Sequence, residues 1–361
     1  MRLTSLAAGI FTLALAAYPV ATTIASRAAA APGKAFAASQ EAAPPGPMGG
    51  GARDDIPQTN QDQPEQQLPQ SSQPLTVATT VVNVFATVRD HHNDIITDLT
   101  KDDFRISEDG VMQKVSYFSK EVNLPITLAL LMDTSYSMHN ILVAEQDAAS
   151  RFVSEVLRKK DEALVISFDT DINLLADFTE DPSVLDRAIH RATINVDAAG
   201  IGGTGGTIPS QGGGTDLYDA IYLACHDELS SEAGRKAIVL LTDAEDTGSK
   251  VSLGEAVEAA QRADTVIHVI LITDSGETEG YGPGVAARMT SDTGGRVINV
   301  RNDKGLEKAF DEISEELRSQ YVLGYYPSNP KRDGTFRRIK VDVDRPDLKI
   351  LARKGYYAPG S

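Results

Sequence analysis

Between residues 124 and 320, continuous apolar runs alternate with segments whose apolar residues recur at helical spacing. Aliphatic and β-branched runs without a polar face are typical of strands buried on both sides. Such strands are predicted over 126–132, 162–168, 236–243, 265–272 and 296–300, with a short antiparallel partner at 174–178. Helical spacing predicts helices over 141–157, 182–192, 217–229, 285–289 and 304–318. This alternation predicts an α/β fold, a doubly wound and mostly parallel sheet covered by helices on both faces.

The segments on either side of this region, 75–122 and 321–358, have a different pattern. They are rich in β-branched and aromatic residues that alternate with polar ones, as half-buried strands do. Strands are predicted over 76–88, 111–118, 321–326, 336–343 and 349–353, and Asp109-Gly110 is a strong hairpin signal. We expect the N-terminal β unit, 75–122, and the C-terminal β segment, 321–358, to pack together as one β domain flanking the α/β domain, 124–320.

The first 74 residues lack the periodicity of either region. Residues 1–37 begin with Met1-Arg2, continue with an apolar Ala/Leu run and end among small residues, the order found in a secretory signal peptide. An uncleaved N-terminal anchor is the alternative, and no other segment approaches the length of a membrane span. Residues 38–74 are rich in Pro, Gln, Gly and Ser, which predicts a disordered linker. The expected location is therefore secreted, periplasmic or at the cell surface.

Charge and cysteine content narrow the function classes. The formal net charge is −17, from 34 basic and 51 acidic residues, so the chain repels phosphate backbones and nucleic acid is not an expected partner. Cys225 is the single cysteine. No disulfide can form within the chain, and the fold must depend on its buried core.

One strand end carries a cluster of oxygen-bearing side chains. Asp133, Ser135 and Ser137 alternate directly after the apolar run 126–132. The carboxyl end of a strand in an open α/β sheet is where such folds bind ligands. Carboxylate and hydroxyl oxygens of low total charge suit Mg²⁺ or Mn²⁺ better than zinc or copper.

Two later segments end in similar side chains, Thr215 after a Gly-rich loop and Asp243 after the predicted strand that begins at Lys236. With these motifs in this order, the chain resembles a von Willebrand factor A domain, whose metal-ion-dependent adhesion site (MIDAS) is D-x-S-x-S, a later Thr and a later T-D. The resemblance places Asp133, Ser135, Ser137, Thr215 and Asp243 at that site, on a von Willebrand A, Rossmann-like fold. Asp246 and Asp216 are predicted to lie at its rim.

The flanking β segments extend the resemblance to about residues 76–358. Residues 98–110 match the string D-L-T-x-x-D-F-x-[IV]-x-E-D-G of a family of bacterial secreted proteins described as von Willebrand factor A-related, of the acidobacterial type. Arg353, Gly355, Tyr356 and Tyr357 match the R-x-G-Y-Y with which that family often ends.

The resemblance implies a secreted, non-enzymatic module that uses Mg²⁺ or Mn²⁺ to bind an Asp or Glu carboxylate of a partner protein. Two other functions stay open. One is a structural or assembly scaffold whose metal site is inactive, and the other is a metal-dependent hydrolase that uses Asp133 or Asp169. For the motif itself, the alternative to metal binding is helix capping by Asp133 with Ser135, and by Thr215 with Asp216.

Overall fold

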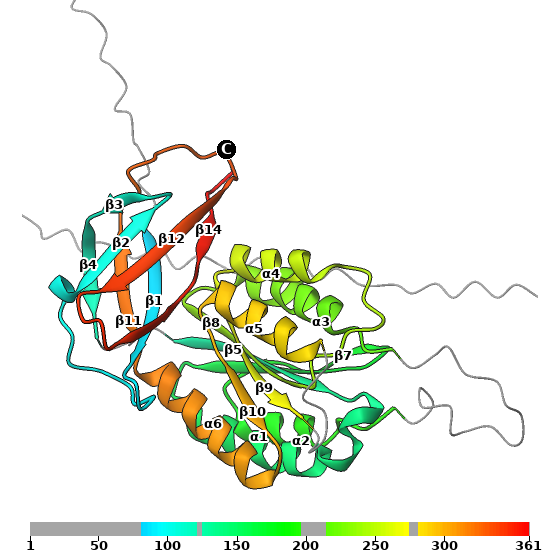
Figure 1. Ribbon diagram of the computed structural model, residues 1–361. Helices are drawn as coiled ribbons and strands as arrows, with labels where there is room; N and C mark the ends of the chain where they lie inside the picture. The colour runs from blue at the N-terminus through cyan, green and yellow to red at the C-terminus, as the bar shows by residue number, and fades with distance from the viewer. Residues whose placement is uncertain (1–80, 121–124, 196–213, 274–280, 361) are drawn as a thin grey trace, which may run out of the picture. The chain divides into compact units, whose positions relative to one another are not determined.

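The apolar runs of the central region form the six strands of one sheet in the computed structural model, which describes residues 81–120, 125–195, 214–273 and 281–360 (Figure 1). The strand order is β10-β9-β8-β5-β6-β7. All neighbours are parallel except β7, which runs antiparallel to β6. The strands are β5 (Ile126–Asp133), β6 (Glu162–Phe168), β7 (Ile172–Thr179), β8 (Arg235–Thr242), β9 (Thr265–Ile272) and β10 (Val297–Val300).

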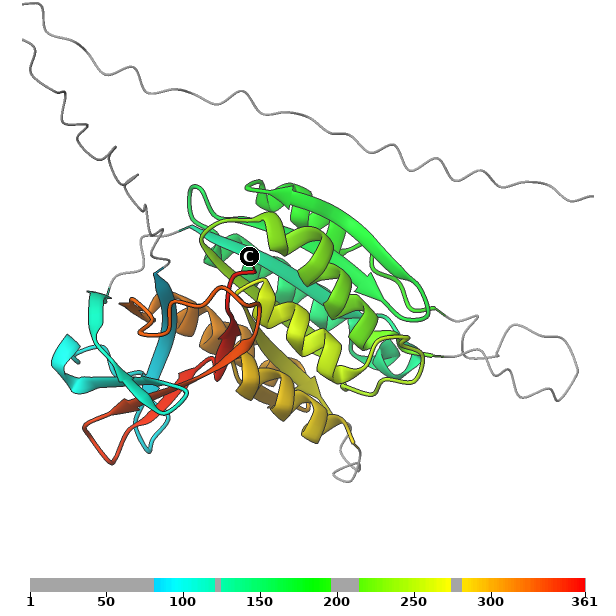
Figure 2. The ribbon, with the colours of Figure 1, turned by 90° about the horizontal axis from the view of Figure 1, so that it is seen from above.

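Helices cover both faces of this sheet because the side chains of each strand point alternately to opposite sides. Leu130 of β5 packs in one core and its neighbour Leu131 in the other. The first core is closed by α1 (Leu142–Val156), α2 (Pro182–Ile189) and α6 (Asp303–Arg318), and the second by α3 (Leu217–Leu223), α4 (Leu253–Arg262) and α5 (Gly282–Thr293). Figure 2 shows α3, α4 and α5, green to yellow-orange, lying across the strands.

Two antiparallel sheets, ordered β13-β1-β11-β4 and β14-β12-β2-β3, enclose a third core. Each combines strands from the two ends of the described chain, since β1 lies between β11 and β13, and β12 lies between β2 and β14. The strands are β1 (Val82–Arg89), β2 (Phe104–Glu108), β3 (Val111–Gln113), β4 (Val115–Ser119), β11 (Tyr321–Tyr325), β12 (Phe336–Val343), β13 (Lys349–Ala352) and β14 (Gly355–Tyr357). Short helical turns complete the described chain: η1 (Lys101–Asp103), η2 (Tyr136–Asn140), η3 (Ala224–Glu228) and η4 (Leu229–Ser231).

The predicted fold class is confirmed: the main sheet is mostly parallel and covered by helices, with antiparallel sheets beside it. The hairpin at Asp109-Gly110 is also present, and both residues have the positive φ, 49° and 84°, that a tight two-residue turn requires. The five domain boundaries stay predictions. The signal and linker segments, and the first residues of the strand predicted over 76–88, lie outside the described residues.

Three element predictions were wrong in detail. The strand expected over 111–118 divides at Lys114, so that β3 pairs with β2 in one sheet and β4 with β11 in the other. The helix expected over 217–229 ends at Leu223 and continues as the π-helical η3. Helix α5 extends beyond the predicted 285–289 at both ends, from Gly282 to Thr293. Within it, Thr290 and Thr293 donate their hydroxyls back to the carbonyls of Ala286 and Met289, so both polar side chains are satisfied inside the helix.

The α/β and β parts of the described chain belong to one compact unit, residues 73–361. A buried ion pair joins them, since Arg89 of β1 donates to Glu316 of α6 over 3.0 Å. Arg296, within the α/β part, lies 3.8 Å from the same carboxylate. Within the described ranges, none of the helices is both long and apolar enough for a membrane crossing.

Candidate metal centre

Asp133 is the last residue of β5, a central strand of the main sheet, and its side chain is fully buried. One carboxylate oxygen, Oδ1, accepts a hydrogen bond from the Ser135 N–H at 2.9 Å. The other, Oδ2, accepts one from the Thr242 hydroxyl at the end of β8, at 2.6 Å. Both bonds fix the orientation of the carboxylate at the carboxyl edge of the sheet.

Ser135 and Ser137 leave the strand in the turn η2, and their hydroxyl oxygens lie 3.0 Å apart. Ser135 occupies the capping position of η2, yet its side chain makes no capping hydrogen bond. The carboxylate and the two hydroxyls that alternate in the sequence are therefore brought together, and at Ser135 the structure does not support the capping alternative.

Thr215 is attached to the same edge through its main chain. Its carbonyl accepts hydrogen bonds from the N–H groups of Thr247 and Gly248, and its own N–H donates to the Thr247 hydroxyl at 2.9 Å. The Thr215 side chain is mostly buried. The loop that follows β8 thus holds Thr215 in place, so the position of this residue depends on a segment distant in sequence.

Asp169, at the end of β6, connects Thr215 with the first motif. The Asp216 N–H donates to the Asp169 carbonyl at 2.7 Å, and the Thr134 hydroxyl donates to the Asp169 carboxylate at 2.9 Å. Asn195 also donates to that carboxylate. Although burial opposes the change, hydrogen bonds led by that of Asn195 lower the pKa of Asp169. Hydrogen bonds to Asp169 thus connect the segments that carry Thr134, Asn195 and Asp216.

Asp243 directly follows β8, and its Oδ1 accepts from the Glu245 N–H at 3.0 Å. Ser137 and Asp243 line one cavity of about 150 Å³, together with Met138, Glu245 and Arg301. The first motif and the end of β8 therefore open onto the same space.

The electrostatics of this edge favour a bound cation. Burial, and next the charge of Asp243, raise the pKa of Asp133 to about 7. Within the described residues, no lysine, arginine or histidine forms an ion pair with Asp133 or Asp243. Two neighbouring carboxylates without a cationic partner, flanked by hydroxyls, are a donor set that fits a hard divalent cation.

The two predicted rim residues lie beside the Thr215 loop. Asp246 accepts hydrogen bonds from the Tyr218 N–H at 3.2 Å and from the Ser249 hydroxyl at 2.5 Å, so it fixes the start of α3. Asp216 precedes α3 without a side-chain capping bond. Burial, followed by the charges of Asp219 and Asp246, raises the pKa of Asp216.

Sequence reasoning missed Thr242, although a signal was present: the T-D pair at the end of β8 supplies both Asp243 and the hydroxyl that donates to Asp133. It also named Asp169 only in the hydrolase alternative. In the described part of the chain, no three His, Cys, Asp or Glu side chains are arranged to hold a metal ion. A cation at this edge would therefore depend on the serine and threonine hydroxyls.

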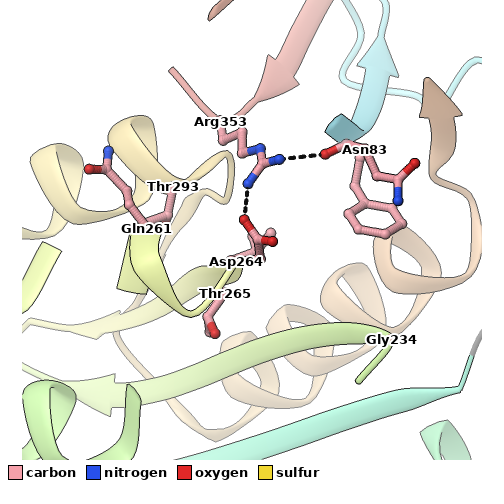
Figure 3. A pocket seen from close by; sticks show the side chains of 9 residues that line it. Asn83, Gly234, Gln261, Asp264, Thr265, Thr293 and Arg353 are labelled. Atoms are coloured by element: carbon pink, nitrogen blue, oxygen red, sulfur yellow. Dashed lines mark hydrogen bonds and ion pairs between the residues drawn. The ribbon is translucent and has the colours of Figure 1, made fainter. Parts of the chain in front are cut away.

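A second cavity, of about 300 Å³, lies at the opposite edge, where β8 and β9 begin (Figure 3). Arg353 crosses it, forming an ion pair with Asp264 and donating to the Asn83 carbonyl at 2.6 Å. Gly234 and Thr265 also line it. None of the predicted site residues lines it, which separates this cavity from the candidate metal centre.

Residues 128–245 match the family model of the von Willebrand factor type A domain. The matched segment contains all five residues of the predicted site, Asp133, Ser135, Ser137, Thr215 and Asp243. No curated protein matches the chain.

Several solved structures share features of the fold. A von Willebrand factor type A protein from Catenulispora acidiphila is 13% identical over 72% of this chain and 74% of its own, with a TM-score of 0.44. The protein BatB from Bacteroides thetaiotaomicron is 19% identical over 54% of this chain and 100% of its own, with a TM-score of 0.40. Proximal thread matrix protein 1 from the mussel byssus, solved with a zinc-occupied MIDAS motif, is 16% identical over 58% of this chain and 49% of its own, at 0.45.

Proposed function

We propose that the protein is a secreted binding module that recognises an acidic side chain of a partner protein through a divalent cation. The observation that carries the proposal is the set of oxygens around Asp133. The hydroxyls of Ser135 and Ser137 lie 3.0 Å apart beside it, and the Asp243 charge acts on it without a cationic partner in the described residues.

In this proposal the hydroxyls of Ser135, Ser137 and Thr215 hold Mg²⁺ or Mn²⁺, with Asp133 and Asp243 acting directly or through water. The bound cation supplies an electrophilic position for an external carboxylate, because few charged protein groups surround it. Thr242 keeps Asp133 oriented by its hydrogen bond of 2.6 Å.

The negative net charge of the chain explains why binding of an acidic partner would require a cation. A net charge of −17 repels an acidic partner at long range. A bridging cation reverses the sign of the interaction at the point of contact. Binding of this kind should therefore be lost when the cation is removed, even though the fold persists.

A non-enzymatic role agrees with the surroundings of the carboxylates. Asp169, one of the two residues that the hydrolase hypothesis names, is occupied by hydrogen bonds from Thr134, Asn195 and the Asp171 N–H. We therefore do not assign Asp169 the role of a general base or nucleophile. The scaffold alternative keeps the same fold but predicts no heat of Mg²⁺ or Mn²⁺ binding in calorimetry.

Affinity capture from extracellular and periplasmic fractions, with Mg²⁺ and with chelator, tests the proposal. We expect a partner that binds the wild type only with Mg²⁺ and is lost with Asp133→Ala and Asp243→Ala. Asp311→Ala, at an exposed position of α6, removes one negative charge that belongs neither to the motif nor to its cavity, and should retain the partner. Equal capture with chelator, or by Asp133→Ala, would contradict cation-dependent recognition.

A further inference from the structure

A third cavity, of about 210 Å³, lies at the edge of the main sheet where β5 and β8 begin. It is formed by the start of β5, the turn after α1, the first residue of β8 and the end of α6, and none of the predicted site residues lines it. Five of its ten lining residues are basic and one is acidic: Arg158, Lys159, Lys160, Arg235 and Arg318, and Asp161. The lining therefore has a formal charge of +4, in a chain whose net charge is −17.

The positive charge of this cavity is not neutralised by the described part of the protein. None of the five basic side chains forms an ion pair with a described carboxylate, whereas Arg151 pairs with Glu307 on the neighbouring surface of α1. Asp161 uses its carboxylate otherwise, because Oδ1 accepts from the Ile126 N–H at 2.9 Å and Oδ2 from the Arg158 N–H at 2.8 Å. The one acid of the lining thus shapes the turn rather than pairing with its cations.

The ends of two helices account for part of this charge. Helices α1 and α6 lie side by side (Figure 1), and both end beside the cavity. Arg318 donates to the Glu155 carbonyl of α1, and Arg235 donates to the Leu317 carbonyl of α6. Basic side chains commonly satisfy the last carbonyls of a helix in this way. That role does not extend to the basic run 158–160, whose side chains make no hydrogen bond with the described residues.

Arg235 is the buried member of the group, at 5% exposed. Its Nη2 also donates to the Gln320 side chain at 2.7 Å, but its Nε has no hydrogen-bond partner among the described residues. Burial lowers the pKa of Arg235 to about 10, so the guanidinium remains charged at neutral pH. A buried charge without a counter-ion is unfavourable, and an anion in the cavity would compensate it.

Lys160 has a backbone conformation that lysine disfavours. The Asp161 N–H donates to the Arg158 carbonyl at 2.9 Å, which closes a turn over 158–161, and Lys160, its third residue, has a φ of 81°. Glycine or asparagine is usual at such a position, because most side chains are strained there. The presence of an exposed lysine therefore points to a use for its charge.

We propose that this cavity binds a phosphate-bearing anion, held by Arg158, Lys159 and Lys160, whose charge also compensates Arg235. A lining of +4 suits phosphate better than a single carboxylate, since arginine offers paired donors to phosphate oxygens and lysine adds a point charge. A water molecule occupies about 30 Å³ of the liquid, so the cavity has room for a phosphate group and several waters. Free phosphate and the headgroup of an anionic phospholipid both present this chemistry. The inference does not rest on the cation site, which lies at the opposite edge.

The test uses the full chain in cation-free buffer, so that an anion bound through a metal ion does not contribute. Binding of inorganic phosphate is measured by calorimetry. Sedimentation with phosphatidylglycerol vesicles, compared with phosphatidylcholine vesicles, tests the lipid headgroup. We expect the wild type to bind phosphate, to prefer phosphatidylglycerol vesicles, or both, and the result identifies which source the cavity accepts.

Variants then assign the binding to the cavity. Lys160→Gly removes one charge and relieves the turn, so the melting temperature should equal or exceed that of the wild type while anion affinity falls about tenfold, the loss expected for one charge-assisted contact. Arg158→Gln removes a second charge and should weaken binding likewise. Lys331→Gly removes an exposed lysine outside the cavity and should bind as the wild type does. Absence of both kinds of binding in the wild type, or wild-type affinity in Lys160→Gly and Arg158→Gln, would overturn the inference.

Discussion

The two edges of the main sheet bury glutamates in opposite electrostatic surroundings. At the edge where β8 begins, Glu316 is 0% exposed and is met by Arg89 and Arg296 at 3.0 and 3.8 Å. At the carboxyl edge, Glu145 is equally buried and is acted on by Asp133 and Asp243. The buried glutamate at the first edge has its counter-charges within the chain. At the second edge, no ion pair to Asp133, Glu145 or Asp243 is formed in the described chain, which agrees with the proposed cation site.

The largest expected effect is on the free energy of unfolding, at the edge where β8 begins. Arg89→Met leaves Glu316 with only the more distant Arg296, and removing one partner of a buried ion pair usually costs roughly 3–5 kcal/mol. We expect the free energy of unfolding in urea to fall by about that amount, with Mn²⁺ affinity unchanged. Arg105→Met, which removes an exposed ion pair with Asp344, should leave the unfolding curve near that of the wild type. Similar curves for the two variants would mean that the buried pair does not stabilise this edge.

The next effect is the pH dependence of the cation-free protein. The pKa of Asp133 is about 7 in the folded state and near 3.8 when unfolded, so between these values the folded state holds a proton that the unfolded state has lost. The contribution of this group to stability should therefore fall as pH rises from about 4 to 7 and level off above, a loss of roughly 4 kcal/mol. Urea unfolding across this range checks the slope. Asp133→Asn or saturating Mn²⁺ should make it shallower, and a slope unchanged by Asp133→Asn would assign it to other groups such as Glu145, whose pKa is also raised.

A smaller effect is expected from a residue that supports Asp133. Thr242→Val keeps the shape of the side chain but removes the hydroxyl that donates to Asp133 at 2.6 Å. We expect Mn²⁺ affinity in calorimetry to fall about tenfold, as for other residues that orient metal ligands. Thr265→Val makes the same change at the opposite edge, where the hydroxyl donates to the Ala263 carbonyl, and should leave affinity unaltered. Equal Mn²⁺ affinities in the two variants would show that the Thr242 hydroxyl does not support cation binding.

The smallest effect should come from the rim. Asp246 is engaged by the Tyr218 N–H and the Ser249 hydroxyl. As a predicted rim residue, it would act on a cation only from a distance. We expect Asp246→Asn to change Mn²⁺ affinity by less than about threefold. A loss as large as that of Asp133→Ala would make Asp246 a ligand and not a rim residue.

Much of the sheet was predictable because its strands are continuous apolar runs between polar residues. The predicted bounds of β6, β9 and β12 agree with the structure. The division at Lys114 was not predictable, since the same alternation of residues suits one long strand or two strands in different sheets. Local pattern specifies the strand, whereas pairing over long distances specifies the sheet.

At the candidate metal centre, too, the local sequence pattern does not predict contacts between distant segments. The alternation of Asp133, Ser135 and Ser137 predicts three oxygens at one strand end, and the two hydroxyls among them do lie together. The burial of Glu145 could not be predicted in this way, because an acid in the first turn of a helix is ordinarily an exposed residue that favours the helix dipole. Only the packing of α1 against the sheet shows that this acid is buried and acted on by Asp133.

The most direct measurement is a crystal structure of the protein soaked in Mn²⁺, with the ion located by its anomalous signal. We predict one strong peak at the carboxyl edge of the sheet, within about 2.5 Å of the hydroxyl oxygens of Ser135, Ser137 and Thr215. A map with no peak there, or a peak bound elsewhere while these hydroxyls keep only protein contacts, would contradict the account.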